Sequence, residues 1–231
     1  MKIFAVDTSS GVASAAVCDG DKLICEVTLN NKLTHSQTLM PIIEEVFARS
    51  GLTPNDIDLF AVAEGPGSFT GLRIGITTVK ALAHAAGKQI AGVNTLEAMC
   101  FNIPFCPYIL SPVMDARRGE VYNAFYRFED GALKELCPPR ALPLSECIDE
   151  IRKMSEEAVF LGDAVPVYKE EITKALGDMA HFAPQNVNMQ RASGVLEAAK
   201  FKKPENYYEL VPKYLRKSQA EREYEERGNK K

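Results

Sequence analysis

The sequence predicts an α/β protein made of two similar lobes, each with the element order βββαβαβα. Short apolar runs between turn residues alternate with stretches whose apolar residues recur at helical spacing. The same order occurs twice along the 231 residues, with little residue identity between the copies. Because alternating helices must cover a sheet, each copy should be a layered unit, with a cleft between the two. We place the first lobe at residues 1–103 and the second at 104–203, and we expect the segment of about 204–231 to pack back on the first lobe.

Turn residues and helix ends define the elements of the first half. Thr8-Ser9-Ser10-Gly11 and Asp19-Gly20-Asp21 are typical of tight turns between three consecutive strands. Gly51 and Gly87 should end the two long helices, and Asn94 should cap a short one. The expected elements are strands 2–7, 12–18 and 22–29, helix 36–50, strand 59–63, helix 70–86, strand 89–93 and a short helix after Asn94.

The second half repeats this order after residue 107. Arg118-Gly119-Glu120 and Glu129-Asp130-Gly131 provide the two turns of a second three-stranded meander. Arg117 and Arg118 could meet an anion, but pairing with neighbouring acids such as Asp115 is the simpler interpretation. The expected elements are strands 108–114, 121–128 and 132–136, helix 145–154, strand 158–161, helix 164–176, a strand near 179–183 and helix 189–200.

Charge is distributed unevenly along the chain, whose formal net charge is −4. From Lys213 onward there are seven basic and four acidic side chains, so this segment carries +3 and residues 1–212 carry −7. An acidic body is a poor electrostatic platform for RNA. We therefore expect this body not to bind RNA by itself.

Cysteine, histidine and apolar patterns exclude several classes of protein. The six cysteines form no C-x-x-C pair, and the three histidines form no H-x-x-x-H pair that could bind zinc on a helix. No apolar run approaches the roughly 20 residues that cross a bilayer, and no basic-then-apolar leader opens the sequence. We expect a cytoplasmic protein without membrane contact.

The duplicated element order matches the ribonuclease-H-like fold shared by actin, Hsp70 and the sugar kinases. In that fold the first hairpin approaches the phosphates of a nucleotide. Small hydroxyls and turn amides can donate to an anion, and a strand–glycine-rich turn–helix arrangement points backbone N–H groups the same way. Alternatively, these residues only organise tight turns. The candidate nucleotide- or anion-binding residues are Asp7, Thr8, Ser9, Ser10, Gly65, Gly67 and Ser68.

Four sequence stretches carry a closer resemblance. They are Glu64 to Gly75 (EGPGSFTGLRIG), Val93 to Met99 (VNTLEAM), Asp115 to Tyr122 (DARRGEVY) and Pro212 to Arg216 (PKYLR). With them the chain resembles the family of the tRNA-modifying transferase TsaD and its non-catalytic paralogue TsaB, also called YeaZ. The resemblance covers most of the chain, is most specific in the first hundred residues, and is weak between about 140 and 200.

The resemblance also suggests the loss of a metal site. The catalytic paralogue carries H-x-E-x-H at the start of the helix after the fifth strand, and its two imidazoles hold a metal. Here the matching residues are Thr95-Leu96-Glu97-Ala98-Met99, and a hydroxyl and a thioether do not replace two imidazoles. We therefore expect no catalytic residue, no metal and no cofactor on this chain, although weak nucleotide binding is compatible with the cleft.

Helices 36–50 and 70–86 have wider apolar faces than one sheet contact needs. Small side chains follow one stripe of helix 70–86, and the apolar face of helix 36–50 spans roughly 160°. These faces either cover the first sheet or bind a partner. The resemblance implies the second, because in TsaB-like proteins these two helices pair with TsaD or with a second TsaB. The interface candidates are Leu39, Ile43, Gly71, Gly75, Thr78 and Leu82.

Two functions follow from this pattern. The first is an accessory subunit that binds and activates or stabilises a TsaD-type transferase, together with a TsaE-type ATPase. That enzyme moves threonylcarbamoyl from its adenylate to the adenosine next to the anticodon. The alternative is an ATP-binding kinase or ATPase of the actin and sugar-kinase fold. It needs a phosphate loop in each lobe, and the bulky Asp115-Ala116-Arg117-Arg118 is a poor second one.

Overall fold

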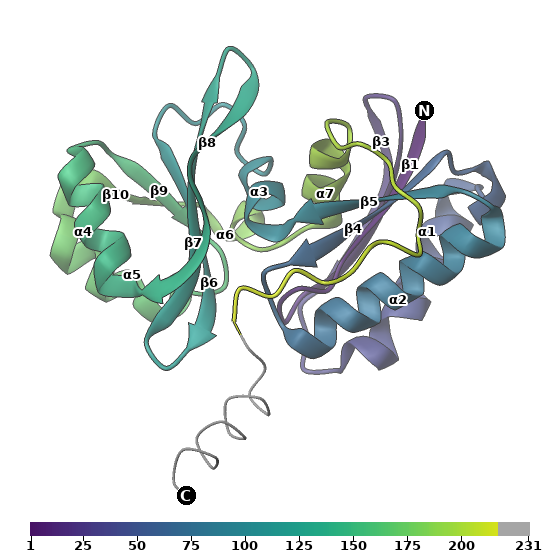
Figure 1. The fold of residues 1–231 in the computed structure, drawn as a ribbon, viewed down its shortest axis with the longest axis horizontal. Coiled ribbons are helices and arrows are strands. Elements are labelled where there is room, and N and C mark those ends of the chain that lie inside the picture. The colour runs from purple at the N-terminus through teal and green to yellow at the C-terminus, as the bar shows by residue number, and fades with distance from the viewer. Residues whose placement is uncertain (217–231) are drawn as a thin grey trace, which may run out of the picture.

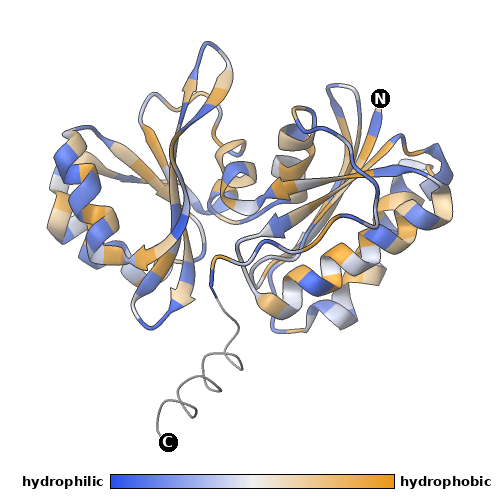
Figure 2. Cartoon of the chain, viewed as in Figure 1, coloured by the Kyte–Doolittle hydropathy of each residue, from blue (hydrophilic) through white to orange (hydrophobic). Residues whose placement is uncertain are grey.

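Two five-stranded mixed sheets, one from each half of the chain, form the centre of the molecule (Figure 1). The computed structural model describes residues 1–216, so the charged segment after Arg216 lies outside the described residues. Within the described part, no helix is both long and apolar enough to cross a membrane. Apolar residues gather along the strands of both sheets, whereas the long helices alternate apolar and polar residues (Figure 2).

The first sheet has the strand order β3-β2-β1-β4-β5. Strand β1 pairs antiparallel with β2 and parallel with β4, with Asp7 opposite Ser14 and Val6 opposite Val62. The elements are β1 (Lys2–Asp7), β2 (Ala13–Asp19), β3 (Lys22–Leu29), α1 (His35–Ser50), the 3-10 turn Pro54–Asp56, β4 (Leu59–Gly65), α2 (Phe69–Ala86), β5 (Gln89–Asn94) and α3 (Thr95–Cys100).

The predicted helix ends of this half are confirmed. Gly51 and Gly87 take left-handed conformations after α1 and α2, which ordinary side chains adopt at a cost. Asn94 caps α3: its Oδ1 accepts from the amides of Leu96 at 2.9 Å and Glu97 at 3.3 Å.

The second sheet has the order β10-β9-β6-β7-β8, the same arrangement as the first. The predicted fold class, two α/β lobes of ribonuclease-H-like topology, is confirmed. The elements are β6 (Ile109–Arg117), β7 (Glu120–Glu129), β8 (Ala132–Pro143), α4 (Leu144–Met154), β9 (Ala158–Leu161), α5 (Val165–Leu176), the 3-10 turn Gly177–Met179, β10 (Ala180–Phe182), α6 (Gln185–Asn188) and α7 (Ala192–Ala199).

Two elements of the second half differ from prediction. Strand β8 continues past the predicted end at 136 to Pro143, because Pro138 and Pro139 lie in a register shift between the pairs Phe125–Cys137 and Asn123–Arg140. The helix predicted over 189–200 is shorter and corresponds to α7 alone, and the separate short helix α6, which was not predicted, precedes it. Arg191 between them is extended, and its side chain forms an ion pair with Glu26 of β3.

Helices α3 and α7 each join the core of the other half's sheet, and α3 also packs on the first sheet through Ala98. In α3, Leu96 and Met99 share a core with Leu110 of the second sheet. In α7, Val195 shares a core with Ile3 of the first sheet. The two helices also contact each other, since an added Cβ at Gly194 would overlap the carbonyl oxygen of Ala98. Each half of the chain therefore contributes a helix to the core of the other lobe.

Helices α1 and α2 cover the opposite face of the first sheet. Leu39 and Ile43 are only 1% and 2% exposed and pack with Phe4 and Phe60 of the sheet. Phe4 also stacks on Phe47 of α1, with ring centroids 4.8 Å apart. The wide apolar face of α1 is thus largely explained by contact within the lobe.

Candidate functional site

A cleft of about 490 Å³ lies between the two lobes. It is formed where three turns and the C-terminal segment meet: the β1–β2 turn, the β4–α2 turn, the β6–β7 hairpin and residues Tyr214 to Arg216. Its lining is rich in hydroxyl, carboxyl and guanidinium groups: Ser9, Ser10, Gly11, Gly67, Ser68, Phe69, Thr70, Met114, Asp115, Ala116, Arg117, Tyr122, Asp163, Tyr214 and Arg216.

Asp7 organises the β1–β2 turn from inside the lobe. Its Oδ1 accepts from the backbone N–H of Ser9 at 2.8 Å and from the Ser9 hydroxyl at 2.6 Å. Its Oδ2 is buried and has no hydrogen-bond partner among residues 1–216. Burial raises the pKa of Asp7, and the bonds from Ser9 oppose this rise. Asp7 does not line the cleft, so its described contacts are those of a turn-forming residue.

Thr8 connects the same turn to helix α2. Its hydroxyl donates to the carbonyl oxygen of Gly71 at 2.8 Å. A Cβ added at Gly71 would overlap the Thr8 carbonyl oxygen, and one added at Gly75 would overlap the Thr8 hydroxyl. The small residues of α2 therefore permit a close approach to the lobe's own turn. Gly71 and Gly75 are corrected from interface residues to packing residues, because their side of the helix is buried.

Gly67 and Ser68 bring the β4–α2 turn against Ser9. The Ser68 amide donates to the carbonyl oxygen of Ser9 at 2.6 Å, and a Cβ at Gly67 would overlap the same oxygen. Ser68 also caps α2, since its Oγ accepts from the Gly71 amide at 3.2 Å. Gly65 instead lies against the backbone of Lys213. Of the seven predicted anion-site residues, four line the cleft, namely Ser9, Ser10, Gly67 and Ser68.

The second lobe brings two carboxyl groups to the cleft. Asp163 Oδ1 accepts from the Asp115 amide at 3.2 Å, and burial, with the nearby charge of Asp115, raises the pKa of Asp163 to about 6. Arg117 Nη1 lies 3.3 Å from Asp115 Oδ2, which is the pairing with a neighbouring acid that the sequence favours. Asp163 also lines the cleft, and no motif in the sequence singled it out.

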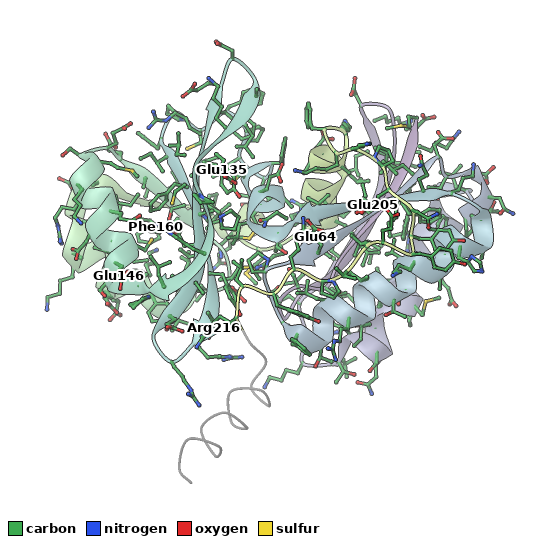
Figure 3. All side chains as sticks on the ribbon, in the orientation of Figure 1. Glu64, Glu135, Glu146, Phe160, Glu205 and Arg216 are labelled. Carbon is green, nitrogen blue, oxygen red and sulfur yellow. The ribbon has the colours of Figure 1, made fainter. Side chains whose placement is uncertain are left out.

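The C-terminal segment completes the cleft. The Tyr214 ring stacks on Phe69 at the start of α2, with centroids 4.2 Å apart. Arg216 Nη1 donates to the Ala116 carbonyl oxygen at 2.5 Å and lies 2.6 Å from Glu120 Oε2. Figure 3 shows Arg216 between the two lobes. The sequence singled out this stretch through resemblance alone, because its contacts are far away in the chain.

Both guanidinium groups of the cleft are engaged by acids, Arg117 by Asp115 and Arg216 by Glu120. What remains for an anion is a set of hydroxyls and turn amides on the first-lobe side, facing the carboxyl groups of Asp115 and Asp163. Such a site can donate hydrogen bonds to a polar ligand, but its carboxyl groups repel a ligand that carries negative charge.

Residues 95–99 lie at the junction of the two lobes. Thr95 is fully buried, and its hydroxyl has no hydrogen-bond partner in the described part of the chain. Met99 is 1% exposed and belongs to the α3 core. The Glu97 carboxylate accepts from Lys202 Nζ, at 2.8 Å through Oε1 and at 2.6 Å through Oε2. Across residues 1–216, no group of three or more His, Cys, Asp or Glu side chains could hold a metal ion.

The six interface candidates fall into two groups. Leu39, Ile43, Gly71 and Gly75 are inside the first lobe and contribute no side-chain area to a docked partner. Thr78 and Leu82 are half-buried on α2 and remain at its surface.

Comparison with known proteins finds a matching family model and relatives that share one name. Residues 22–224 match the family model described as TsaD, tRNA N6-adenosine threonylcarbamoyltransferase. The chain is 32% identical over 221 residues to the tRNA threonylcarbamoyladenosine biosynthesis protein TsaB of Bacillus subtilis, covering 96% of each chain. It is 31% identical over 166 residues to TsaB of Escherichia coli, covering 70% of this chain and 71% of that protein.

Solved structures show the same fold. A crystal structure from Pseudomonas aeruginosa, of an uncharacterised protein with similarity to peptidase YEAZ, superposes with a TM-score of 0.78 at 22% identity, covering 93% of this chain and 99% of that one. The structure of YeaZ from the same organism gives a TM-score of 0.73 at 21% identity, with the same coverage.

Proposed function

Since this chain belongs to the family of TsaD and TsaB, the proteins of tRNA threonylcarbamoyladenosine biosynthesis, we propose that it is the accessory subunit and not the transferase. The relative named TsaB from Bacillus subtilis matches almost the whole chain, with 96% coverage. In this role it binds and stabilises or activates a TsaD-type enzyme. That enzyme transfers threonylcarbamoyl from threonylcarbamoyl-AMP to the adenosine next to the anticodon.

The environment of Thr95 and Met99 is the observation that carries the non-catalytic role. The resemblance implies that both occupy positions where the transferase has metal-binding imidazoles. Both side chains are buried. A thioether packed in an apolar core is a poor ligand for a hard or borderline divalent ion. Glu97, the acid that matches the motif, is held by Lys202. These contacts support a structural role for residues 95–99.

The partner surface in this proposal is the solvent side of α1 and α2. Thr78 and Leu82 on α2 and the 44% exposed Met40 on α1 are its candidate contacts. The same surface would serve a TsaD-type partner or a second copy of this chain, with a TsaE-type ATPase as third member. The acidic body supports contact with tRNA only through the complex. For a role in tRNA modification, we propose that the chain works in the cytoplasm.

We propose no resident cofactor, and at most weak nucleotide binding in the cleft. The hydroxyls of Ser9, Ser10 and Ser68 favour a phosphate, whereas the carboxyl groups of Asp115 and Asp163 oppose one. The alternative function, an ATP-binding kinase or ATPase, is not favoured, because the relatives are tRNA biosynthesis proteins.

Reconstitution tests the proposed function directly. The cognate TsaD and TsaE proteins are assayed for threonylcarbamoyl transfer to tRNA with this chain, without it, and with this chain as the sole protein. We expect transfer only when this chain is present with its partners, and no turnover by the chain alone. Transfer by the chain alone, or full transfer in its absence, would overturn the accessory role.

A further inference from the structure

Residues 204–216, here called the C-terminal strap, run along the first lobe in an extended path (Figure 1). Near its start, Glu205 exchanges two backbone hydrogen bonds with Ile90 of β5, at 2.8 and 3.1 Å. In the middle, Leu210 is 2% exposed in the first-lobe core. Near its end, the Lys213 amide donates to the Glu64 carbonyl oxygen at 2.7 Å. The strap is thus fixed to the first lobe along its length.

The last residues of the strap cross to the other lobe. Tyr214 is the final anchor on the first lobe, stacked on Phe69 and accepting from Arg73 Nε at 3.0 Å. Two residues later, Arg216 binds the β6–β7 hairpin of the second lobe through Glu120 and the Ala116 carbonyl oxygen. The Arg216 side chain is 17% exposed and Glu120 is 33% exposed, so the pair is partly shielded from solvent.

The lobes are joined in two separate regions. Helices α3 and α7 form one connection, whereas Arg216 lies between the lobes near the turn of the β6–β7 hairpin (Figures 1 and 3). Two lobes joined in one region can move as a hinge about it, and a second connection at a distance restricts that motion.

We propose that the C-terminal strap is an intramolecular clasp that fixes the angle between the lobes, with Arg216 as the residue that closes it on Glu120 and Ala116. The cleft is then held in one shape without a bound ligand. A molecule that displaces Tyr214 or Arg216 would release the second lobe and open the cleft. This inference rests on the contacts of the strap and does not depend on the proposed function.

Amide hydrogen exchange of the full chain tests the clasp, with Arg216→Ala as the test variant. Loss of the clasp should make the amides of residues 115–121 and of the first turn of α2 exchange about tenfold faster, which corresponds to about 1.4 kcal/mol of local opening free energy. Amides in the centres of both sheets should be unchanged. Unchanged exchange at 115–121 would overturn the proposal.

Arg127→Ala is the matched control. Arg127 lies at the far end of the same strand β7, is 25% exposed, and forms an ion pair with Glu156. We expect no acceleration at 115–121 in this variant. Equal acceleration of amide exchange at 115–121 in both variants would mean that these amides respond to the overall stability of the second lobe. That result would overturn the proposal. A double-mutant cycle with Glu120→Gln should show that the effects of the two substitutions do not add.

Discussion

Gly75 faces the hydroxyl of Thr8 so closely that an added Cβ would overlap it. The stripe of small residues on α2 therefore fits the β1–β2 turn of the same lobe. This contact links the start of the fold to its longest helix, and it places the turn at the edge of the cleft.

Replacing Gly75 with Leu should destabilise the protein. The larger side chain would force apart α2 and the β1–β2 turn, and overpacking of this kind costs about 1–3 kcal/mol. Urea unfolding measures the loss. Thr77→Leu, at an exposed position of the same helix, is the control and should change the free energy of unfolding by less than about 0.5 kcal/mol. Equal stabilities of the two variants would contradict the close contact.

Thr78→Arg should weaken binding to a TsaD-type partner without unfolding the chain. Thr78 lies at the surface of α2, where a long charged side chain is accommodated in water but not in a packed interface. We expect at least a tenfold higher Kd by calorimetric titration, about 1.4 kcal/mol. Val167→Arg on α5, exposed by 63%, should leave Kd unchanged. Unaltered binding by Thr78→Arg would remove α2 from the proposed interface.

Asp163→Asn should become progressively more stable than the parent protein as pH rises. The pKa of Asp163 is raised to about 6 in the folded chain, from an ordinary value of 3.8. The folded state therefore binds the proton more tightly, and the stability that Asp163 contributes is lost as pH rises between these two values. Asparagine retains the acceptor for the Asp115 amide without the charge.

Urea unfolding at several pH values between about 4 and 7 follows this change. Asp178→Asn, which removes an exposed carboxyl group of the second lobe, is the control and should show no such trend. If the difference in free energy of unfolding between the parent protein and Asp163→Asn stays constant across this range, the burial of the Asp163 charge is contradicted.

Glu97→Ala should leave threonylcarbamoyl transfer in the reconstituted system almost unchanged. The described side-chain contact of Glu97 is its ion pair with Lys202, which is partly exposed and contributes at most about 1 kcal/mol to stability. Lys202→Ala should cause a similar small loss in urea unfolding. Abolished transfer with a folded Glu97→Ala variant would show that this acid still takes part in the chemistry.

The sequence predicted most of the elements because their signals are local. Asn94 lies two and three residues from the amides it caps, and Gly51 directly follows the helix it ends. The duplicated βββαβαβα pattern gave the order of elements along the chain, and the two sheets share one strand order.

Long-range contacts could not be predicted in this way. Thr8 and Gly71 are 63 residues apart, so the spacing of small residues on α2 suggested a partner helix when the true neighbour was a distant turn. Arg216 and Ala116 are 100 residues apart, and no periodicity relates them. Asp163 and Asp115 are 48 residues apart, and the parallel pairing of β9 with β6 within the second lobe brings them together.

The position of α7 on the first sheet has a consequence for synthesis on the ribosome. The face of the first sheet that carries Ile3 and Ala5 is covered by α7, whose last residue is Ala199. Until that helix emerges, a nascent chain of about 190 residues, which takes at least about ten seconds to make, exposes an apolar sheet face. Chaperone contact with this face during translation, and aggregation of fragments that end before α7, are the expected results.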